Sequence, residues 1–558
     1  MAWFLPQLIE EVEKRLGSEY PVTTELPSNQ SAWLAVPVFA AAKQSGRTVN
    51  EVANEVAEKL RTVDDVDVTI TGGFVNVSPR EFTTVLSESA DPTYPASEVG
   101  GGKKVIVEFA GPNVAKPMGI GHLRSTIIGD SLQRILRVLG YDVQSHNYLG
   151  DWGTQFGKVL VAYQEKYGDL KPREDTTLEE LLALYVGFHT DAERDPELDE
   201  AARTMFKRLE DGDQDVRNLW RHLVDISLKE MFAIFERLGG VTLDYPEDGE
   251  AFYEPYLHDV IADAQKQGVA KESDGALIIE IPGESAPLLL RKSNGTTTYA
   301  TRDLAQVRYR VRTFHPTKIL YCVANEQALH FRQYYAAARM LGFVPESVEL
   351  IHVKFGLMRG TEGKLSTRRG TTVFLQDVMD EAVKRARAVV EEKNPDLADA
   401  EKDRIAEVVG IGALKYFDLS HDRKHDIVFD WDRMLQLTGD SGPYLQYTYV
   451  RAAQILTKAG ESPSEIPNGN LADDVQRLIR ELAKFPLVVE WAAHDATPHT
   501  LAQYLNNVAT QFSRFYETYP VLKAEGDERA IRLAIVKGVA NVLKRGLGLL
   551  GIEVLGRM

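Results

Sequence analysis

Two hydrophobic patterns alternate over the first 95 residues of the chain. Apolar residues recur at helical spacing in LPQLIEEVEKRL and TVNEVANEVAEKLRTV, which predicts amphipathic helices. The segment VDVTITGGFVNVSP alternates instead, which predicts two short strands joined by a Gly-Gly turn. We therefore expect an α+β domain over residues 1–95. The stretch SESADPTYPASEVGGGKK, rich in Ser, Pro and Gly, reads as a linker.

From Lys103 the pattern changes to strand, helix and strand. VIVEFA is typical of a buried strand, and HLRSTIIGDSLQRILRVLG is helical and ends at a glycine cap. YDVQSHNY predicts a second strand. Because strands joined in this way pair in parallel, we expect a Rossmann-like domain over residues 96–390. Residues 175–290 are acidic and helix-rich, so they are predicted to form a helical insertion in that domain.

Helical spacing continues through the rest of the chain. It runs through VMDEAVKRARAVV and GALKYFDL, and through nearly everything after SGPYLQYTYVRAAQIL. We expect a helical connecting region over residues 391–440 and an α-helical bundle over residues 441–558. The predicted fold class is therefore multidomain α/β plus α: an N-terminal α+β domain, a Rossmann-like parallel-sheet domain with a helical insertion, and a C-terminal helical bundle.

Charge and cysteine content add to this picture. The chain of 558 residues has a formal net charge of -18, but residues 451–558 hold 13 Lys and Arg against 12 Asp and Glu. Global acidity argues against a polyanion partner, yet local patches decide nucleic-acid contact, so the less acidic end keeps that contact open. The single cysteine, Cys322, excludes an intramolecular disulfide and suits a reducing compartment.

The start of the chain and its apolar runs indicate where the protein resides. MAWFLPQLIEEVEKRLG lacks the basic start, apolar centre and cleavage site of a signal peptide. No uninterrupted apolar run in the sequence reaches membrane-spanning length. These observations predict a cytoplasmic protein without a membrane partner.

A glycine-rich turn precedes the first helix of the Rossmann-like pattern. In GPNVAKPMGIGHLRSTIIGD, Gly119 and Gly121 let a ligand approach the backbone, and His122 can donate to a phosphate oxygen. Free backbone N–H groups and the helix dipole would add to such an anion site. Taken alone, the sequence favours a plain tight turn over an anion site, because glycine-rich turns before helices are common.

Two further segments carry candidate chemistry. In GLMRGTEGKLSTRRGTTVFL, Lys364 and Arg368 with Ser366 could neutralise a polyphosphate, although a solvated basic loop is the alternative. In TTTYATRDLAQVRYRVR, Tyr299 and Asp303 are four residues apart and share a helix face. A carboxylate beside an aromatic ring suits a guanidinium, whereas the alternative is a surface ion pair of Asp303 with Arg302 or Arg308.

Six segments in the same order resemble one family along nearly the whole chain. They are PNVAKPMGIGHLRSTIIGD, NYLGDWGTQFG, YATRDLAQ, ANEQALHF, GKLSTRRGTTVFL and SGPYLQYTYVRAAQIL, and together they resemble the arginyl-tRNA synthetases, which are class I aminoacyl-tRNA synthetases. The resemblance implies that arginine and ATP form arginyl-adenylate and pyrophosphate. The arginyl group then passes to the 3′-terminal ribose of tRNA(Arg). No enzyme nucleophile is needed, and no separate editing domain is evident.

The resemblance also implies which side chains act. Residues implied to bind ATP are Pro112, Gly119, Gly121, His122, Met358 and Lys364, and those implied in catalysis are Lys116, His122, Lys364, Ser366 and Arg368. Residues implied to bind arginine are Tyr299, Asp303 and Gln327 at the guanidinium, and Asn113 and Asn147 at the other end. Tyr447 and Arg451 are implied to contact tRNA. Mg²⁺ is implied with ATP, no structural metal is implied, and the family analogy suggests a monomer.

The chain departs from the family signatures at two positions. Gly119 stands where the HIGH signature has its first histidine, and Thr367 stands where the KMSKS loop has its second lysine. In the family a lysine upstream of HIGH is thought to compensate, and Lys116 occupies that place. Gly119 leaves open a catalytically weakened paralogue that only binds tRNA or a partner.

A class I synthetase for glutamate or cysteine is a further alternative. The carboxylate of Asp303 would repel glutamate, and one cysteine without a histidine cluster argues against the zinc site of a cysteine enzyme.

Overall fold

The computed structural model describes residues 3–17, 24–27, 32–360, 373–460, 465–469 and 471–558. By its internal contacts the chain divides into two compact units. One contains residues 1–99, 435–549 and 553–558, and the other contains residues 100–434 and 550–552. The domain limits expected at residues 95, 390 and 440 stay predictions. No helix in the described ranges is both long and apolar enough to span a bilayer.

A three-stranded antiparallel sheet opens the first unit, with its strands in the order β1-β3-β2. The elements are α1 (Phe4–Leu16), β1 (Leu34–Pro37), α2 (Phe39–Ser45), α3 (Val49–Leu60), β2 (Val66–Thr71), β3 (Phe74–Pro79) and α4 (Thr83–Ser89). Gly72 and Gly73, with φ of +56° and +91°, make the turn between β2 and β3. The hairpin and the two amphipathic helices predicted before it, α1 and α3, are confirmed.

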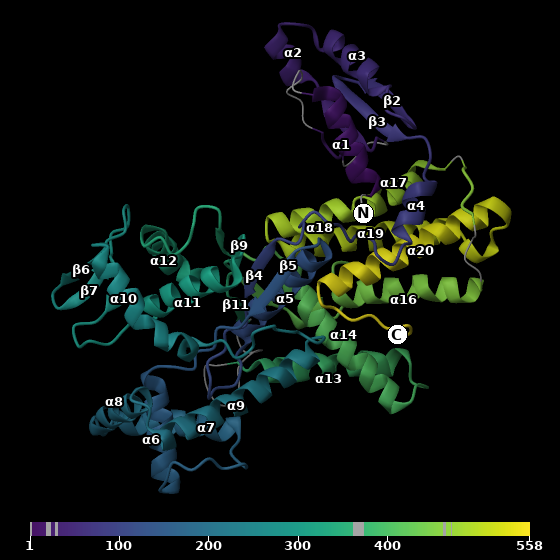
Figure 1. The fold of residues 1–558 in the computed structure, drawn as a ribbon. Helices are drawn as coiled ribbons and strands as arrows, with labels where there is room; N and C mark the ends of the chain where they lie inside the picture. The colour runs from purple at the N-terminus through teal and green to yellow at the C-terminus, as the bar shows by residue number, and fades with distance from the viewer. Residues whose placement is uncertain (1–2, 18–23, 28–31, 361–372, 461–464, 470) are drawn as a thin grey trace. The chain divides into compact units, whose positions relative to one another are not determined.

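Helices build the remainder of this unit (Figure 1). They are α16 (Gly442–Ala459), α17 (Asp473–Ala483), α18 (Phe485–His494), α19 (Pro498–Thr518), the 3-10 helix η4 (Val521–Lys523) and α20 (Gly526–Leu549). The long helix α20 packs against α16, α19 and α4. Leu543 and Leu547 of α20 are fully buried, as is Leu505 of α19. The predicted C-terminal helical bundle is confirmed.

A four-stranded parallel sheet forms the centre of the second unit, in the order β10-β9-β4-β5 (Figure 1). Its strands are β4 (Lys104–Glu108), β5 (Asp142–His146), β9 (Lys318–Tyr321) and β10 (Glu349–His352). β4 is buried from Val105 onward and pairs in parallel with β5 and β9. Parallel sheets need cover on both faces, which explains this apolar strand. The Rossmann-like sheet is confirmed.

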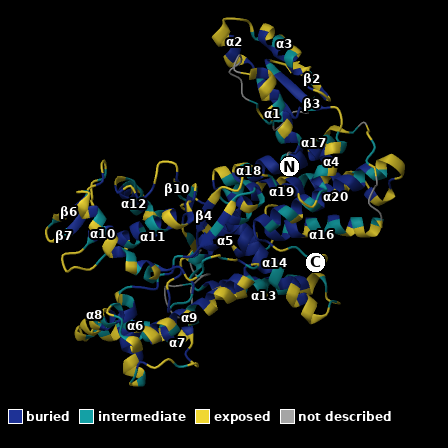
Figure 2. Ribbon diagram, viewed as in Figure 1, coloured by how far each residue is buried: buried dark blue, intermediate teal, exposed yellow. Residues whose placement is uncertain are grey.

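Helix α5 (Ile120–Val138) connects β4 to β5 and is buried along most of its length (Figure 2). The other elements of this unit are α6 (Thr154–Tyr167), α7 (Leu178–Ala192), α8 (Glu197–Glu210), α9 (Gln214–Arg237), η2 (Glu250–Tyr256), α10 (Leu257–Lys266), β6 (Ala270–Ser273), β7 (Ala276–Ile279), β8 (Leu288–Arg291), α11 (Tyr299–Phe314), η3 (Asn325–Gln327), α12 (Ala328–Met340), β11 (Met358–Gly360), α13 (Leu375–Lys393), α14 (Asp399–Leu419), β12 (Ile427–Phe429) and α15 (Trp431–Met434).

The expected insertion is helical only in its first part. Helices α7 to α10 are followed by the antiparallel strands β6, β7 and β8, which pair in that order. Asp274 and Gly275 both have positive φ, 50° and 78°, so they form a two-residue hairpin turn between β6 and β7. The Asp-Gly pair was a local signal for this hairpin, and the acidic, helix-rich composition of the segment obscured it.

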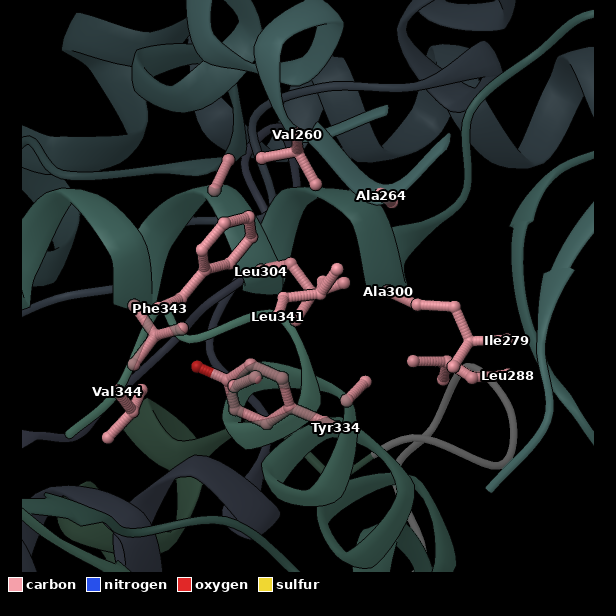
Figure 3. Packing of buried hydrophobic residues seen from close by; sticks show 14 of the residues in the cluster. Val260, Ala264, Ile279, Leu288, Ala300, Leu304, Tyr334, Leu341, Phe343 and Val344 are labelled. Atoms are coloured by element: carbon pink, nitrogen blue, oxygen red, sulfur yellow. The ribbon is translucent and has the colours of Figure 1, made fainter. Parts of the chain in front are cut away.

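A hydrophobic core holds α11 and α12 against this small sheet (Figure 3). Ala300 and Leu304 of α11, Tyr334 of α12, Leu341 directly after α12, and Leu288 of β8 are all buried in it. Interiors packed in this way keep side chains in single rotamers. The N-terminal turns of α11 and α12 therefore start from a fixed base, and both turns carry candidate site residues.

Candidate active site

The α5 entrance, which we define as Met118–His122, places His122 in a fixed orientation. The backbone N–H of Gly119 donates to Nδ1 of His122 at 3.0 Å. Since Nδ1 is the acceptor, the neutral ring carries its proton on Nε2. Burial lowers the pKa of His122 below its ordinary value, which favours this neutral form. His122 is thus prepared to donate one hydrogen bond from Nε2.

The backbone at this entrance differs from the expected anion site. The N–H of Gly119 is taken by His122, that of Ile120 donates to the Val373 carbonyl at 2.9 Å, and that of His122 donates to the Gly119 carbonyl at 3.0 Å. These three groups are therefore not free to bind a phosphate. A Cβ added at Gly121 would meet nothing within 4 Å, so the space beside this glycine is open. Side chains, rather than these amides, must supply most of the positive charge.

The basic loop, which we define as Gly356–Leu375, is held at both of its ends by α5 or by the residues just before it. At its C-terminal end, Gly119 bridges Phe374, and the N–H of Leu375 donates to the Met118 carbonyl at 2.8 Å. At its N-terminal end, the buried Arg124 donates from Nη1 to the Gly356 carbonyl at 2.6 Å and pairs with Asp418 at 2.9 Å. Met358, predicted to bind ATP, lies between these anchors and is partly buried.

Four residues of that loop that the sequence analysis named fall outside the described residues. They are Lys364, Ser366, Thr367 and Arg368. Their predicted roles on ATP stay predictions.

Lys116 lies in the loop that leads to α5, and its side chain contacts an aromatic ring. Its Nζ lies 3.9 Å from the ring centroid of Tyr185 on α7, a cation–π contact. Among the described residues, Lys116 has no ion-pair partner. Its ammonium group is therefore available to an anionic ligand at the cost of one aromatic contact.

Two alanines in this loop adopt the left-handed backbone region. Ala110 has φ +72° and Ala115 has φ +62°, and each conformation costs about 1–2 kcal/mol for a residue with a Cβ. Hydroxyl groups hold both turns: the Ala110 N–H donates to Ser125 at 3.0 Å, and the Ala115 N–H donates to Ser227 at 2.9 Å. Strain maintained in this way is typical of functional loops, and it fixes the backbone on both sides of Asn113.

We define the Asp303 cluster as Tyr148, Tyr299, Asp303 and His330. Oδ1 of Asp303 accepts from the Tyr148 hydroxyl at 2.9 Å, and Oδ2 contacts Nε2 of His330 at 2.5 Å. Tyr299 begins α11, is 58% exposed, and meets the His330 ring edge to face at 4.7 Å. The structure therefore brings the predicted pair Tyr299 and Asp303 together with two side chains that the sequence analysis did not single out.

The alternative role of Asp303 as a surface ion pair is not what the structure shows. Arg302 faces Glu250 at 3.7 Å, and Arg308 pairs with Asp263 at 2.6 Å. Within the described chain, Asp303 has no lysine or arginine partner. Its carboxylate is therefore available to a cation from outside.

A second carboxylate close behind this cluster is already neutralised. Glu108, at the end of β4, forms a buried pair with Arg310 and accepts from Gln306 at 2.8 Å. Burial raises the pKa of Glu108 to about 7. Asp303 differs from Glu108 in having no arginine partner among the described residues.

The other residues predicted at the arginine site differ in exposure. Asn113 and Gln327 are exposed, and Gln327 lies three residues before His330 at the start of α12. Pro112 is buried, and its carbonyl accepts from the Gly150 N–H at 3.1 Å. This bond ties the Asn113 backbone to the segment after β5.

Asn147 is fully buried, and its side chain is engaged on both sides. Oδ1 accepts from the backbone N–H groups of Gly111 and Tyr148, at 3.1 and 3.0 Å. Nδ2 donates to the Pro246 carbonyl at 3.0 Å and contacts Met231 Sδ at 3.4 Å. An amide has two acceptor sites and two donors, so none remains for arginine in this arrangement. The structure thus places Asn147 behind the site as a support for its two loops.

The first unit holds the residues predicted to contact tRNA. Arg451 on α16 donates from Nη2 to the Tyr447 hydroxyl at 2.9 Å, and its guanidinium lies 4.8 Å from that ring centroid. Tyr516 of α19 approaches the same guanidinium at 5.1 Å. Tyr447 and Tyr516 are both 38% exposed. The structure adds Tyr516, which no local sequence signal connects to the other two.

Three residues with contacts in these sites were missed from the sequence. Tyr148 directly follows Asn147 in NYLGDW, and His330 lies within ANEQALHF at helical spacing from Gln327. Both stood inside recognised segments, so their spacing to a predicted neighbour could have found them. Tyr516 comes from a distant helix, and only the fold brings it to Arg451.

Two families of known protein domains match this chain. The family described as tRNA synthetases class I (R), catalytic domain, matches residues 83–431, and the DALR anticodon binding domain matches residues 445–558. With the parallel sheet and the α5 entrance, these matches define a class I aminoacyl-tRNA synthetase.

Relatives identify the family within this class. The chain is 40% identical to arginine–tRNA ligase 1 of Bacillus cereus over 93% of this chain and 92% of the relative. It is 40% identical to the arginine–tRNA ligase of Chloroflexus aggregans over 96% and 95%. The arginyl-tRNA synthetase structure from Thermus thermophilus superposes with a TM-score of 0.83 at 27% identity, covering 99% of both chains. The chain belongs to the arginyl-tRNA synthetases, and the alternatives of a glutamate or cysteine enzyme are excluded.

Proposed function

We propose that Asp303 binds the guanidinium group of L-arginine, with Tyr299 and Gln327 beside it. The observation that carries this proposal is the Asp303 carboxylate, which Tyr148 and His330 hold and which no lysine or arginine of the described residues pairs with. A guanidinium is a planar fork of N–H donors that matches a carboxylate in two parallel bonds. An uncharged analogue would leave Asp303 unpaired, which explains discrimination without an editing step.

At the opposite end of the substrate, Asn113 contacts the α-amino or carboxylate group of arginine. Asn113 is exposed at a backbone position fixed by the Gly150 and Val114 hydrogen bonds. Asn147 contributes by holding this loop in place, because its own amide is already engaged. The arginine carboxylate then faces the α5 entrance, where ATP binds.

Positive side chains act on the phosphates of ATP in this proposal. His122 donates from Nε2, and Lys116 leaves the Tyr185 ring to approach the phosphates. Lys364, Ser366 and Arg368 of the basic loop join them, and Pro112, Gly119, Gly121 and Met358 line the nucleotide. Mg²⁺ arrives with ATP as part of the substrate. The open space at Gly121 supports close approach of the nucleotide to the backbone.

These contacts suit in-line transfer at the α-phosphorus. A carboxylate oxygen of arginine forms a bond to the α-phosphorus while the bond to the β-phosphate oxygen breaks, so pyrophosphate leaves. The 3′-terminal ribose hydroxyl of tRNA(Arg) then attacks the arginyl carbonyl and AMP leaves. Because the charge accumulates on phosphate oxygens, positioned cations accelerate the step without an enzyme nucleophile.

We further propose that the exposed group of Tyr447, Arg451 and Tyr516 contacts unpaired bases of tRNA(Arg). Aromatic rings and a guanidinium plane offer stacking surfaces for such bases. The near-neutral charge of residues 451–558 removes the repulsion that the rest of this acidic chain would impose. Action as a cytoplasmic monomer completes the proposal and rests on the sequence analysis and the family analogy.

Arginine-dependent ATP–pyrophosphate exchange, measured with and without tRNA(Arg), tests the central assignment. For Asp303→Asn we expect kcat/KM for arginine to fall about a thousandfold, because the guanidinium would be desolvated without a counter-charge. The KM for ATP should stay within about threefold of the wild-type value. Asp259→Asn, an exposed carboxylate on α10, is the matched control and should behave as wild type. An unchanged KM for arginine in Asp303→Asn would contradict the assignment.

A further inference from the structure

His330 controls one of the two oxygens of the Asp303 carboxylate. Nε2 of His330 lies 2.5 Å from Oδ2, while the Tyr148 hydroxyl donates to Oδ1 at 2.9 Å. The side chains of His330 and Asp303 are only 10% and 15% exposed, so water competes little for these bonds. A carboxylate has about four acceptor positions, and these two donors leave about two for a ligand. Two positions are what a forked guanidinium requires.

The hydrogen-bond pattern of His330 indicates which nitrogen carries the proton. Its Nδ1 is buried and has no partner among the described residues. A doubly protonated ring would bury an unsatisfied N–H donor at Nδ1, whereas a ring protonated only at Nε2 leaves an unused acceptor there. The neutral Nε2–H form therefore fits the site. As a neutral donor, His330 orients Asp303 and leaves its negative charge for the ligand.

Two aromatic neighbours, Tyr334 and Tyr299, contact the His330 ring. Its ring is nearly parallel to that of Tyr334, with 7° between the planes and 5.9 Å between centroids. Tyr334 is 1% exposed and belongs to the packed core of α11 and α12 (Figure 3). The ring also meets the exposed Tyr299, at 4.7 Å between centroids and 72° between the planes. His330 thus links a fixed core residue to Asp303 and Tyr299.

We infer that His330 is a positioning residue that sets the plane of the Asp303 carboxylate for a planar, two-point guanidinium ligand. This inference rests on the proposed role of Asp303 as the guanidinium receptor. Without the Nε2–H donor, the carboxylate would rotate about its last side-chain bond and present its oxygens in many orientations. A guanidinium would then lose one of its two parallel bonds, whereas the α-phosphorus chemistry would be unaffected once arginine is bound.

Three substitutions separate the donor from the ring. His330→Ala removes both, His330→Phe keeps an aromatic ring without the donor, and His330→Gln replaces Nε2–H by an amide N–H at a similar reach. We expect the KM for arginine in ATP–pyrophosphate exchange with tRNA(Arg) to rise about tenfold in the Ala and Phe variants, because a hydrogen bond to a charged group is lost. The kcat should stay within about twofold. His330→Gln should restore most of the arginine affinity.

The outcomes distinguish this inference from the proposal on which it rests. If Asp303→Asn abolishes arginine use while His330→Ala keeps the wild-type KM, His330 does not position Asp303 and the inference is wrong. If His330→Phe restores the KM and His330→Gln does not, ring packing rather than the donor matters, which also overturns it. An unchanged KM in Asp303→Asn would remove the guanidinium receptor itself. Thermal unfolding of each variant shows whether a raised KM comes with an intact fold, as the inference requires.

Discussion

The proposed arginine end and the proposed ATP end of the candidate site are built in opposite ways. At the Asp303 cluster, partly buried partners hold both carboxylate oxygens: Tyr148 donates to one, His330 contacts the other, and Tyr334 from the core of α11 and α12 stacks on His330. At the α5 entrance, the backbone N–H groups of Gly119, Ile120 and His122 already donate to acceptors within the protein, and Lys116 lies on the ring of Tyr185. One end is therefore preorganised, and the other must gather its charge when ATP arrives.

This difference matches what each substrate requires. Arginine must be distinguished from uncharged and single-point analogues, and a rigid receptor gives such selectivity. The phosphates of ATP change their charge distribution during the reaction, so groups that engage them in the transition state raise the rate rather than the affinity. Substitutions at the Asp303 cluster should consequently raise the KM for arginine, and substitutions at the α5 entrance should lower kcat or raise the KM for ATP.

Removal of the Lys116 charge should give the largest effect at the ATP end. We expect Lys116→Ala to lower kcat of arginine-dependent exchange about a hundredfold, the usual loss when one preorganised group at a developing charge is removed. The KM for arginine should change less than about threefold. Lys116→Arg keeps the charge and the aromatic contact with Tyr185, so it should retain most of the rate.

A control at Tyr185 tells charge from packing. Tyr185→Leu removes the ring on which Lys116 rests but leaves the ammonium, and we expect its kcat to stay within about fivefold of wild type. If Lys116→Ala were fully active, the chain would draw its phosphate-stabilising charge from elsewhere, and the contrast between the two ends would lose its main support at the ATP end.

Two glycine substitutions sharpen the contrast with a smaller effect. A Cβ at Gly150 would lie 2.4 Å from Oδ1 of Asn113, so Gly150→Ala must displace that side chain and should raise the KM for arginine about tenfold. At Gly121 a Cβ would meet no protein atom within 4 Å, so Gly121→Ala should fold normally. If ATP occupies that space, its KM should rise about tenfold while the KM for arginine is unchanged.

Each of these glycine variants is the control for the other. Steady-state exchange with arginine and ATP varied in turn gives both KM values, and circular dichroism gives the fold. A Gly121→Ala enzyme with an unchanged KM for ATP would show that the nucleotide does not approach this glycine. A rise of both KM values in both variants would show that the two ends are not separate.

The sequence predicted the central sheet and its first crossover because their signals are local. β4, α5 and β5 each carry their own hydrophobic period, and Gly119 and Gly121 mark the turn at the mouth of α5. Tyr299 and Asp303 likewise share one helical turn. Family resemblance supplied the rest of the candidate site, residue by residue, without indicating which polar atoms were still free.

What the sequence could not give are the long-range partners. The side chain of Asn147 forms hydrogen bonds with Gly111 and Pro246, and the Ile120 N–H donates to the Val373 carbonyl. These bonds depend on segments that lie far apart in the chain. At the α5 entrance, the expected anion site lacks the free amide of Ile120 for this reason, whereas the amides of Gly119 and His122 are taken by bonds within residues 119–122. Burial and hydrogen-bond satisfaction are properties of the fold, and a local pattern contains neither.

The smallest expected effect is on the pH dependence of stability, through His146 in the strand next to the proposed arginine end. His146 closes β5 directly before Asn147; its ring stacks on Tyr245 at 4.2 Å, and its Nδ1 lies 2.8 Å from Asp248. Burial lowers the pKa of His146 to about 4 in the folded chain. In the unfolded chain the same side chain has a pKa of about 6.5. Between these values the unfolded chain binds a proton that the folded chain does not. The free energy of unfolding should therefore fall on acidification, by about 1 kcal/mol at pH 5.5 and about 3 kcal/mol below pH 4.

Urea unfolding of wild type and His146→Gln at pH 7.5 and 5.5 isolates this contribution. Gln does not titrate, so the stability difference between the two proteins should shift by about 1 kcal/mol in favour of the variant at the lower pH. Other groups cancel in that difference, including His352, whose pKa burial also lowers to about 4. A difference that stays constant with pH would mean that His146 protonates equally easily in both states. The His146 ring would then be as accessible to water in the folded chain as in the unfolded chain. The contrast between a rigid arginine end and an open ATP end would then not include the residues that pack behind Asn147.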